Sequence, residues 1–137
     1  MHTAEATREA TPWAETQSRW SEAGTTFLAT VRPDGRPHMV PVGAVNLGDD
    51  AFYFTSGQGT RKDRNLAKNP ACVLSASREG YDLVIEGTVA QVAEAALLQR
   101  LAARYNEVGW PVKVQGDKFD APFSAPTTGP LRTRCTK

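Results

Sequence analysis

Apolar and polar positions alternate along much of the chain, and this pattern predicts β-strands. Residues 25–32 (TTFLATVR) follow the two-residue period of a strand. The turn signal PDGR joins them to residues 37–46 (PHMVPVGAVN), which are apolar on both faces, as in a barrel strand that is covered on each side. Because Pro41 cannot donate a ladder hydrogen bond, we expect a bulge or a sheet edge there. Gly43 either lets a flat group approach closely or simply allows the barrel to curve.

Further strand-like segments extend the expected sheet. Residues 52–55 (FYFT) are aromatic or β-branched, and residues 71–77 and 81–92 form a predicted hairpin around the turn REG. Residues 109–114 are a candidate short strand. Together these segments predict about six antiparallel strands, a mainly β fold of the α+β class. The pattern by itself also allows an OB-type barrel.

Helical spacing predicts three short helices that cap the sheet. Residues 11–22 begin with Thr-Pro, a good N-cap and first helical position. Trp13 and Trp20 are seven apart and share a face of this helix; we expect core packing for both, with a substrate lid as the alternative. A second helix starts at Thr60 and stops at the sequence KNP, and a third covers residues 93–105.

The segment that leads into the second helix is the strongest candidate for a binding site. Its sequence, TSGQGTRKDRN, turns on two glycines from a strand into a helix start. Thr60 is the expected N-cap, and Asp63 stands at the spacing that opens a helix. Arg61, Lys62 and Arg64 fall in the first turn, where cations oppose the helix dipole. Free N–H groups and these charges predict a bound anion, most simply a phosphate. A basic surface helix in contact only with solvent is the alternative.

Composition excludes several classes of protein. At 137 residues and 14.9 kDa the chain is one domain by length, and a net charge of +1 argues against a general nucleic-acid or membrane-surface binder. We find no apolar run that could span a membrane and no signal peptide, so we expect a cytoplasmic protein. Two cysteines and two histidines make no disulfide framework and no metal site. His38, on an apolar strand, is expected to be a packed or rim histidine.

No set of side chains in the sequence amounts to a catalytic apparatus. Nucleophile elbows, paired carboxylates and HExxH are absent, so any chemistry must come from a cofactor. We divide the chain into a mobile N-terminus (residues 1–10), a cofactor-binding domain (11–114) and a Pro-rich C-terminal tail (115–137). In the tail no strand can be recognised, and a loop over a neighbouring subunit or over the cofactor is an alternative to disorder.

The sequence resembles a known family in three stretches: LATVRPDGRPHMVPVGAV, TSGQGTRKDRNLAKNPACVL and YDLVIEGTVAQV. It is similar to the pyridoxamine 5′-phosphate oxidase-like split β-barrel family, and within it to the flavin- and deazaflavin-dependent oxidoreductases. The resemblance implies a homodimeric split barrel with the cofactor at the subunit interface. It implies these cofactor-binding residues: Val40, Pro41 and Val42 at the ring, Phe54, Thr55 and Ser56 along the ribityl chain, and Thr60, Arg61, Lys62 and Asn65 at the phosphate.

From the resemblance we expect an oxidoreductase that transfers hydride between a reduced deazaflavin (coenzyme F420) or FMN and a small electrophilic acceptor. The alternative is a non-catalytic flavin- or haem-binding protein on the same fold. The choice of F420 over FMN depends on positive charge beyond what one phosphate requires, since the deazaflavin tail carries further carboxylates. The residues that would supply this charge are Arg64, Lys68, Arg132, Arg134 and Lys137.

Overall fold

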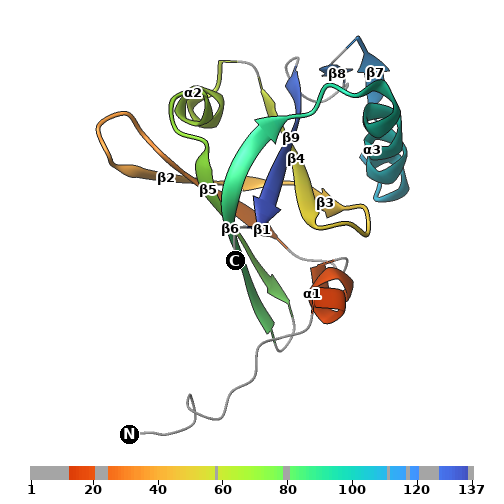
Figure 1. Ribbon diagram of the computed structural model, residues 1–137, viewed down its shortest axis with the longest axis horizontal. Helices are drawn as coiled ribbons and strands as arrows, with labels where there is room; N and C mark the ends of the chain where they lie inside the picture. Colours follow the sequence, from red (N-terminus) through yellow and green to blue (C-terminus); the bar gives the residue numbers. More distant parts are fainter. Residues whose placement is uncertain are drawn as a thin grey trace, which may run out of the picture.

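The computed structural model describes residues 13–20, 25–57, 59–78, 81–110, 112–116, 118–120 and 127–135. A seven-stranded antiparallel sheet forms its body, and three helices lie around it (Figure 1). The strands of this sheet are β1 (Thr26–Val31), β2 (Pro37–Val42), β3 (Ala44–Asn46), β4 (Ala51–Gly57), β5 (Ala71–Arg78), β6 (Tyr81–Gln91) and β9 (Thr127–Cys135). The helices are α1 (Trp13–Trp20), α2 (Arg61–Lys68) and α3 (Ala95–Glu107), and β7 (Lys113–Gln115) pairs with β8 (Lys118–Asp120) in a second, two-stranded sheet. The fold is therefore mainly β, as predicted.

The order of the strands shows how the sheet closes into a barrel. The order is β2-β1-β5-β6-β9-β4-β3, so β2 and β3 stand at its two ends. These two strands are consecutive in the chain and are separated only by Gly43. One bent segment thus provides both edges of the sheet, and the barrel closes through the backbone rather than through a further ladder. The position of Pro41 on an edge strand confirms the expectation for that residue, because its missing N–H falls where no second partner strand is present.

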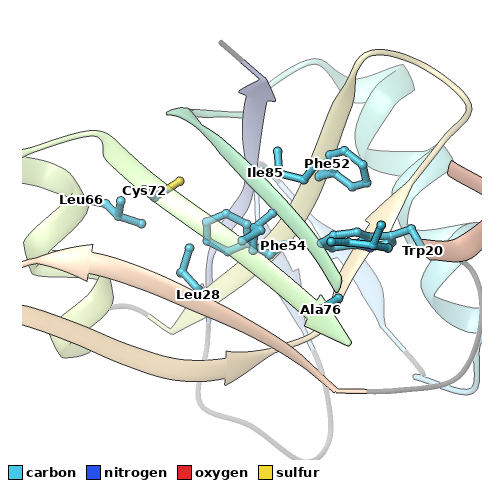
Figure 2. Packing of buried hydrophobic residues seen from close by; sticks show 10 residues of the cluster. Trp20, Leu28, Phe52, Phe54, Leu66, Cys72, Ala76 and Ile85 are labelled. Atoms are coloured by element: carbon cyan, nitrogen blue, oxygen red, sulfur yellow. The ribbon is translucent and has the colours of Figure 1, made fainter. Parts of the chain in front are cut away.

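Two clusters of buried side chains fill the interior. The first lies inside the barrel and includes Trp20, Leu28, Phe54 and Leu66, which Figure 2 shows converging from α1, β1, β4 and α2. The second lies under α3 and is formed mainly from β4 and from that helix. Strand β4 contributes alternate residues to the two clusters, so it is the strand that is covered on both faces.

The prediction that residues 37–46 form one strand covered on both faces is wrong for the single chain. The segment breaks at Gly43, and along β2 exposed and half-buried positions alternate. Met39 is 62% exposed and Pro41 is also exposed. The reason is that the core covers only one face of β2, as it does for the neighbouring strands β1 and β5. The outward face of β2 is therefore apolar without being covered by the core of its own chain.

A C-terminal strand is present where the sequence showed none. Strand β9 lies between β6 and β4 in the middle of the sheet order and pairs with both. Its Pro130 pairs with Thr55, next to an irregularity of register between Thr55 and Gly57, and β6 pairs only from Leu131 onward. The proline therefore stands where it interrupts the ladder least. The division of the chain at residue 114 stays a prediction, although β9 belongs to the main sheet.

The helices agree with their predicted positions. Thr60 and Asn69 cap α2 as expected, and α3 buries Leu98, Leu101, Ala102 and Tyr105 on one side. Trp20 at the end of α1 lies in the core and donates from its indole nitrogen to the carbonyl oxygen of Ala44 (3.2 Å), which confirms core packing for this tryptophan. The expected N-cap at residues 11–12 and the expected mobile residues 1–10 lie outside the described residues. No helix in the described part of the chain is long and apolar enough to cross a membrane.

Candidate functional site: a cationic cluster and a neighbouring cavity

The start of α2 has the geometry that its sequence predicts. The Thr60 hydroxyl accepts a hydrogen bond from the backbone N–H of Asp63 (3.3 Å), and the Asp63 carboxylate accepts one from the backbone N–H of Gly59 (2.9 Å). Gly59 has φ +78°, a conformation that favours glycine, and so allows the tight entry into the helix. The backbone N–H groups of Arg61 and Lys62 precede Asp63 and have no partner within the helix, so they are available to a ligand.

A buried hydrogen bond and the packing of Leu66 in the interior cluster together hold this helix on the barrel. Asn65 is completely buried, and its amide nitrogen donates to the hydroxyl of Thr30 on β1 (3.0 Å). Thr30 in turn pairs with His38 on β2. Because Arg61 and Lys62 lie one turn before Asn65, this contact holds the basic first turn of α2 beside the imidazole of His38. Asn65 thus positions the start of α2, and its contact with a phosphate stays a prediction.

Four basic side chains lie near one another where α2 meets the β1–β2 hairpin, and we call them the cationic cluster: Arg32, His38, Arg61 and Lys62. Burial lowers the pKa of the Lys62 ammonium below its usual range, and the neighbouring carboxylate of Asp63 offsets this only in part. Desolvation also lowers the pKa of His38, and the charges of Arg32, Arg61 and Lys62 lower it further. The three neighbouring charges oppose protonation of His38, so a bound anion would offset their effect and favour the charged imidazole.

His38 adds a second sign that a ligand belongs here. Its Nδ1 atom is buried and has no hydrogen-bond partner in the described part of the chain. A buried polar atom of this kind costs free energy unless something outside the chain satisfies it. The sequence predicts a packed or rim histidine at position 38 and no role for Arg32. The signal that would have found them is the hairpin register, which pairs residue 38 with the strand position that Asn65 contacts.

The other predicted cofactor residues lie on two strands. Val40, Pro41 and Val42 are on β2, with Pro41 facing outward and Val42 packed against the interior cluster. Phe54 is completely buried in that cluster, and Ser56 is also buried, so their side chains face the interior. The residues on β2 and those on β4 are close in space, because β3 continues β2 beyond the bend and pairs with β4, with Ala44 opposite Phe54. Only the outward and backbone atoms of these strands are therefore available to a cofactor.

A cavity of about 540 Å³ opens at the far end of β2 from the cationic cluster. Its walls come from α1, the β2–β3 bend, the end of β5 and the end of α3; they include Trp20, Pro41, Gly43, Arg78, Arg104 and Trp110. Pro41 and Val42 belong both to this cavity and to the predicted ring site, whereas no residue of α2 lines it. The structure thus brings part of the predicted site to the cavity and leaves the phosphate end separate.

No group of three or more histidine, cysteine, aspartate or glutamate side chains that could hold a metal ion occurs among the described residues. Cys72 is buried in β5.

Comparison with known proteins identifies the same family that the sequence resembles. The family profile of pyridoxamine 5′-phosphate oxidase matches residues 12–124. No curated protein matches the sequence.

Similar solved structures share the fold across almost the whole chain. An F420 reductase aligns with 24% identity and a TM-score of 0.60, over 88% of this chain and 93% of that one. A conserved hypothetical protein from Mycobacterium tuberculosis aligns with 20% identity and a TM-score of 0.69, over 93% and 82%. HupZ from Group A Streptococcus aligns with 12% identity and a TM-score of 0.66, over 93% and 91%. At these identities the likeness supports the split-barrel fold and no more.

Proposed function

The chain belongs to the pyridoxamine 5′-phosphate oxidase family, and from this premise we propose that it is an oxidoreductase that binds a phosphate-bearing flavin cofactor at the cationic cluster. We propose coenzyme F420 as the cofactor, with FMN as the alternative. Arg64 and Lys68 support this choice, because they extend the positive charge of α2 beyond what one phosphate requires and the deazaflavin tail carries further carboxylates. When bound, the cofactor would supply hydride to a small electrophilic acceptor. The cytoplasmic location stays a prediction.

The observation that carries the proposal is the cationic cluster at the start of α2. The pKa values of Lys62 and His38 are both lowered, and Nδ1 of His38 is buried without a hydrogen-bond partner among the described residues. A phosphate fits all three features, since it brings negative charge and several acceptor oxygens to one point. Thr60, Arg61 and Lys62 would hold the phosphate with the N–H groups of the helix start, and His38 would approach from β2.

From the phosphate, the cofactor would extend along the outer side of β2. Pro41 and the backbone of this edge strand would position the ring, because the edge leaves peptide groups of β2 without a partner strand. The chain's own work in the reaction is then to bind, to orient the ring and to exclude water from one side of it.

The outer face of the sheet supports a homodimer that would cover this ring site. One row of paired residues crosses the outer face of four neighbouring strands: Pro41 on β2, Phe27 on β1, Ser75 on β5 and Val84 on β6. Phe27 is 39% exposed and Val84 is 59% exposed, and Met39 extends the same face. An apolar surface that crosses four strands favours a partner of the same kind, and we propose that a second copy packs on it. This would explain why β2 is apolar on the side that its own core does not cover.

The test compares two lysines at opposite ends of α2. Lys62→Ala should weaken FMN and F420 binding by about 1.5–3 kcal/mol, as for a lost charge-assisted hydrogen bond to phosphate. Lys68→Ala, in the exposed last turn, is the matched control and should leave FMN binding unchanged. Titration of the purified protein with each cofactor measures both effects. Equal effects of the two substitutions on FMN would show that the start of α2 does not hold the phosphate.

The same pair of variants distinguishes the cofactors. If the carboxylate tail of F420 follows the basic side of α2, Lys68→Ala should weaken F420 binding by up to about 1 kcal/mol while FMN stays unaffected. The wild-type preference for F420 should also narrow as salt is raised, because exposed charges are screened. Tighter binding of FMN would overturn the choice of F420. Binding of reduced F420 without its oxidation by any acceptor would instead support a carrier over an enzyme.

A further inference from the structure

We propose that the 540 Å³ cavity at the end of β2 is a binding site for a planar aromatic anion, which Arg78 and Arg104 hold by its negative group. The cavity has the size typical of small-molecule sites. It is separate from the cationic cluster, since none of the four residues of that cluster lines it.

Arg78 is the first observation. It lies at the end of β5, is only 8% exposed, and lines the cavity. Its guanidinium donates to the carbonyl oxygens of Trp20 (3.2 Å) and Ser77 (3.0 Å), but its Nε atom is buried without a partner. It forms no ion pair with any carboxylate in the part of the chain that the structure describes. Among the described residues, only neutral carbonyl oxygens accept hydrogen bonds from this buried guanidinium. An anion bound beside it would therefore stabilise its charge.

Arg104 provides a second positive charge at the opposite wall. It comes from the last turn of α3 and forms an ion pair with Glu107 (3.1 Å), with 31% of its side chain exposed. Among the described residues that line the cavity, Arg78 and Arg104 carry the charge, and none is an aspartate or a glutamate. The charge of the walls is therefore complementary to an anion.

The remaining walls favour a flat, apolar body. The guanidinium of Arg78 lies 5.9 Å from the ring of Trp20, and Trp110 lies against Gly43, where no side chain intervenes. Trp110 also stacks on Tyr105, with ring centroids 5.9 Å apart and planes only 7° from parallel. Both indoles line the cavity, but Trp20 is buried in the core, so Trp110, which is 43% exposed, is the ring that suits an aromatic ligand.

The position of the cavity indicates the role of such a ligand. Pro41 and Val42 belong to the cavity and to the strand along which we place the cofactor ring, so the bound anion would lie next to the ring. We therefore assign the cavity to the electron acceptor. This assignment rests on the proposed function, whereas binding of the anion does not, because the cavity forms from this chain alone.

Binding is tested on the wild-type protein without added cofactor, by calorimetry with 2-naphthoate. Its neutral amide, 2-naphthamide, has the same shape and serves as the matched probe. We expect saturable binding of 2-naphthoate at micromolar to submillimolar concentration, about tenfold tighter than the amide, because only the carboxylate gains charge-assisted hydrogen bonds. Lack of saturation below about 1 mM, or equal binding of the two probes, would overturn the proposal.

Variants then locate the bound probe. Replacement of Arg78 would also remove its hydrogen bond to the end of α1, so Arg104→Gln is the informative substitution. It should weaken 2-naphthoate binding about fivefold and leave the amide unchanged. Arg100→Gln, one turn earlier on α3 and outside the cavity, is its control and should have no effect.

Lys62→Ala separates this proposal from the proposed function. It should weaken the cofactor and leave 2-naphthoate binding unchanged. If Lys62→Ala weakened the probe as well, the probe would be bound at the cationic cluster and the cavity proposal would fail. If Arg104→Gln and Arg100→Gln had equal effects on the probe, the proposal would also fail, while the result for the cofactor would stand.

Discussion

Replacement of Gly43 by alanine tests the bend that closes the barrel. An added Cβ would lie 1.4 Å from Cζ3 and 1.7 Å from Cη2 of Trp110, far inside any van der Waals contact. The backbone itself would accept alanine, because Gly43 is not among the glycines with positive φ. The strain therefore falls on Trp110, whose ring must move away by about 2 Å to restore ordinary contact distances.

The size of the effect follows from what Trp110 would lose. Its stacking on Tyr105 contributes about 0.5–1.5 kcal/mol. It is 43% exposed, so roughly half of a tryptophan's area, on the order of 100 Å², is buried and contributes up to about 2.5 kcal/mol. Replacing glycine returns about 0.4–1 kcal/mol by restricting the unfolded chain. We expect Gly43→Ala to lower the free energy of unfolding by about 1–3 kcal/mol, since the displaced ring keeps some contacts.

Urea unfolding of a double-mutant cycle measures this effect. In a Trp110→Ala background the clash is absent, so Gly43→Ala should be neutral or should stabilise the protein by up to about 1 kcal/mol. The two substitutions should therefore couple by about 1–4 kcal/mol. If Gly43→Ala costs the same in both backgrounds, the tryptophan does not lie on the glycine, and the cavity wall described above is wrong.

Three other predictions concern the dimer, the imidazole and the helix cap. Val84→Glu should convert the dimer to monomer by light scattering, whereas Val108→Glu, also at an exposed valine but off this sheet face, should not. Desolvation and the nearby positive charges lower the pKa of His38 below its ordinary value of 6.5, so its contribution to stability is present above that pH and is lost as the pH falls. Bound phosphate should raise this pKa, so cofactor affinity should increase between about pH 8 and about pH 6 in wild type relative to His38→Gln, as titration at each pH would show. Thr60→Ala should lower the free energy of unfolding by about 1 kcal/mol, measured in urea, and no change would refute the cap.

Local signals made much of the fold predictable. The β1–β2 turn, the capped start of α2 and its end at Asn69 all depend on neighbours within a few residues, which the sequence shows directly. Strand β9 could not be found in this way. Five of its nine residues are threonine or arginine, and Pro130 stands among them, so its place in the sheet depends on partners far away in the chain.

The candidate site was predictable in part for the same reason. The basic first turn of α2 is a local pattern, and the structure keeps those residues together. Arg32 and His38 join them only because the hairpin register and the Asn65–Thr30 hydrogen bond bring three elements to one corner. The cavity walls come from α1, β2, β5 and α3, and no spacing in the sequence relates Arg78 to Trp110. Such sites require the folded chain before they can be recognised.

Strand β2 connects the two sites, and its geometry gives them a common logic. His38 stands near its start in the cationic cluster, and Gly43 follows its end at the cavity. Five residues of extended strand separate them, about 17 Å at roughly 3.3 Å per residue. A cofactor with its phosphate at His38 would therefore bring its ring toward Pro41, where the cavity begins and where the outer sheet face offers a second copy of the chain. If both sites operate, the bend at Gly43 is the point at which cofactor, acceptor and barrel closure meet, and its substitution should affect stability and anion binding together.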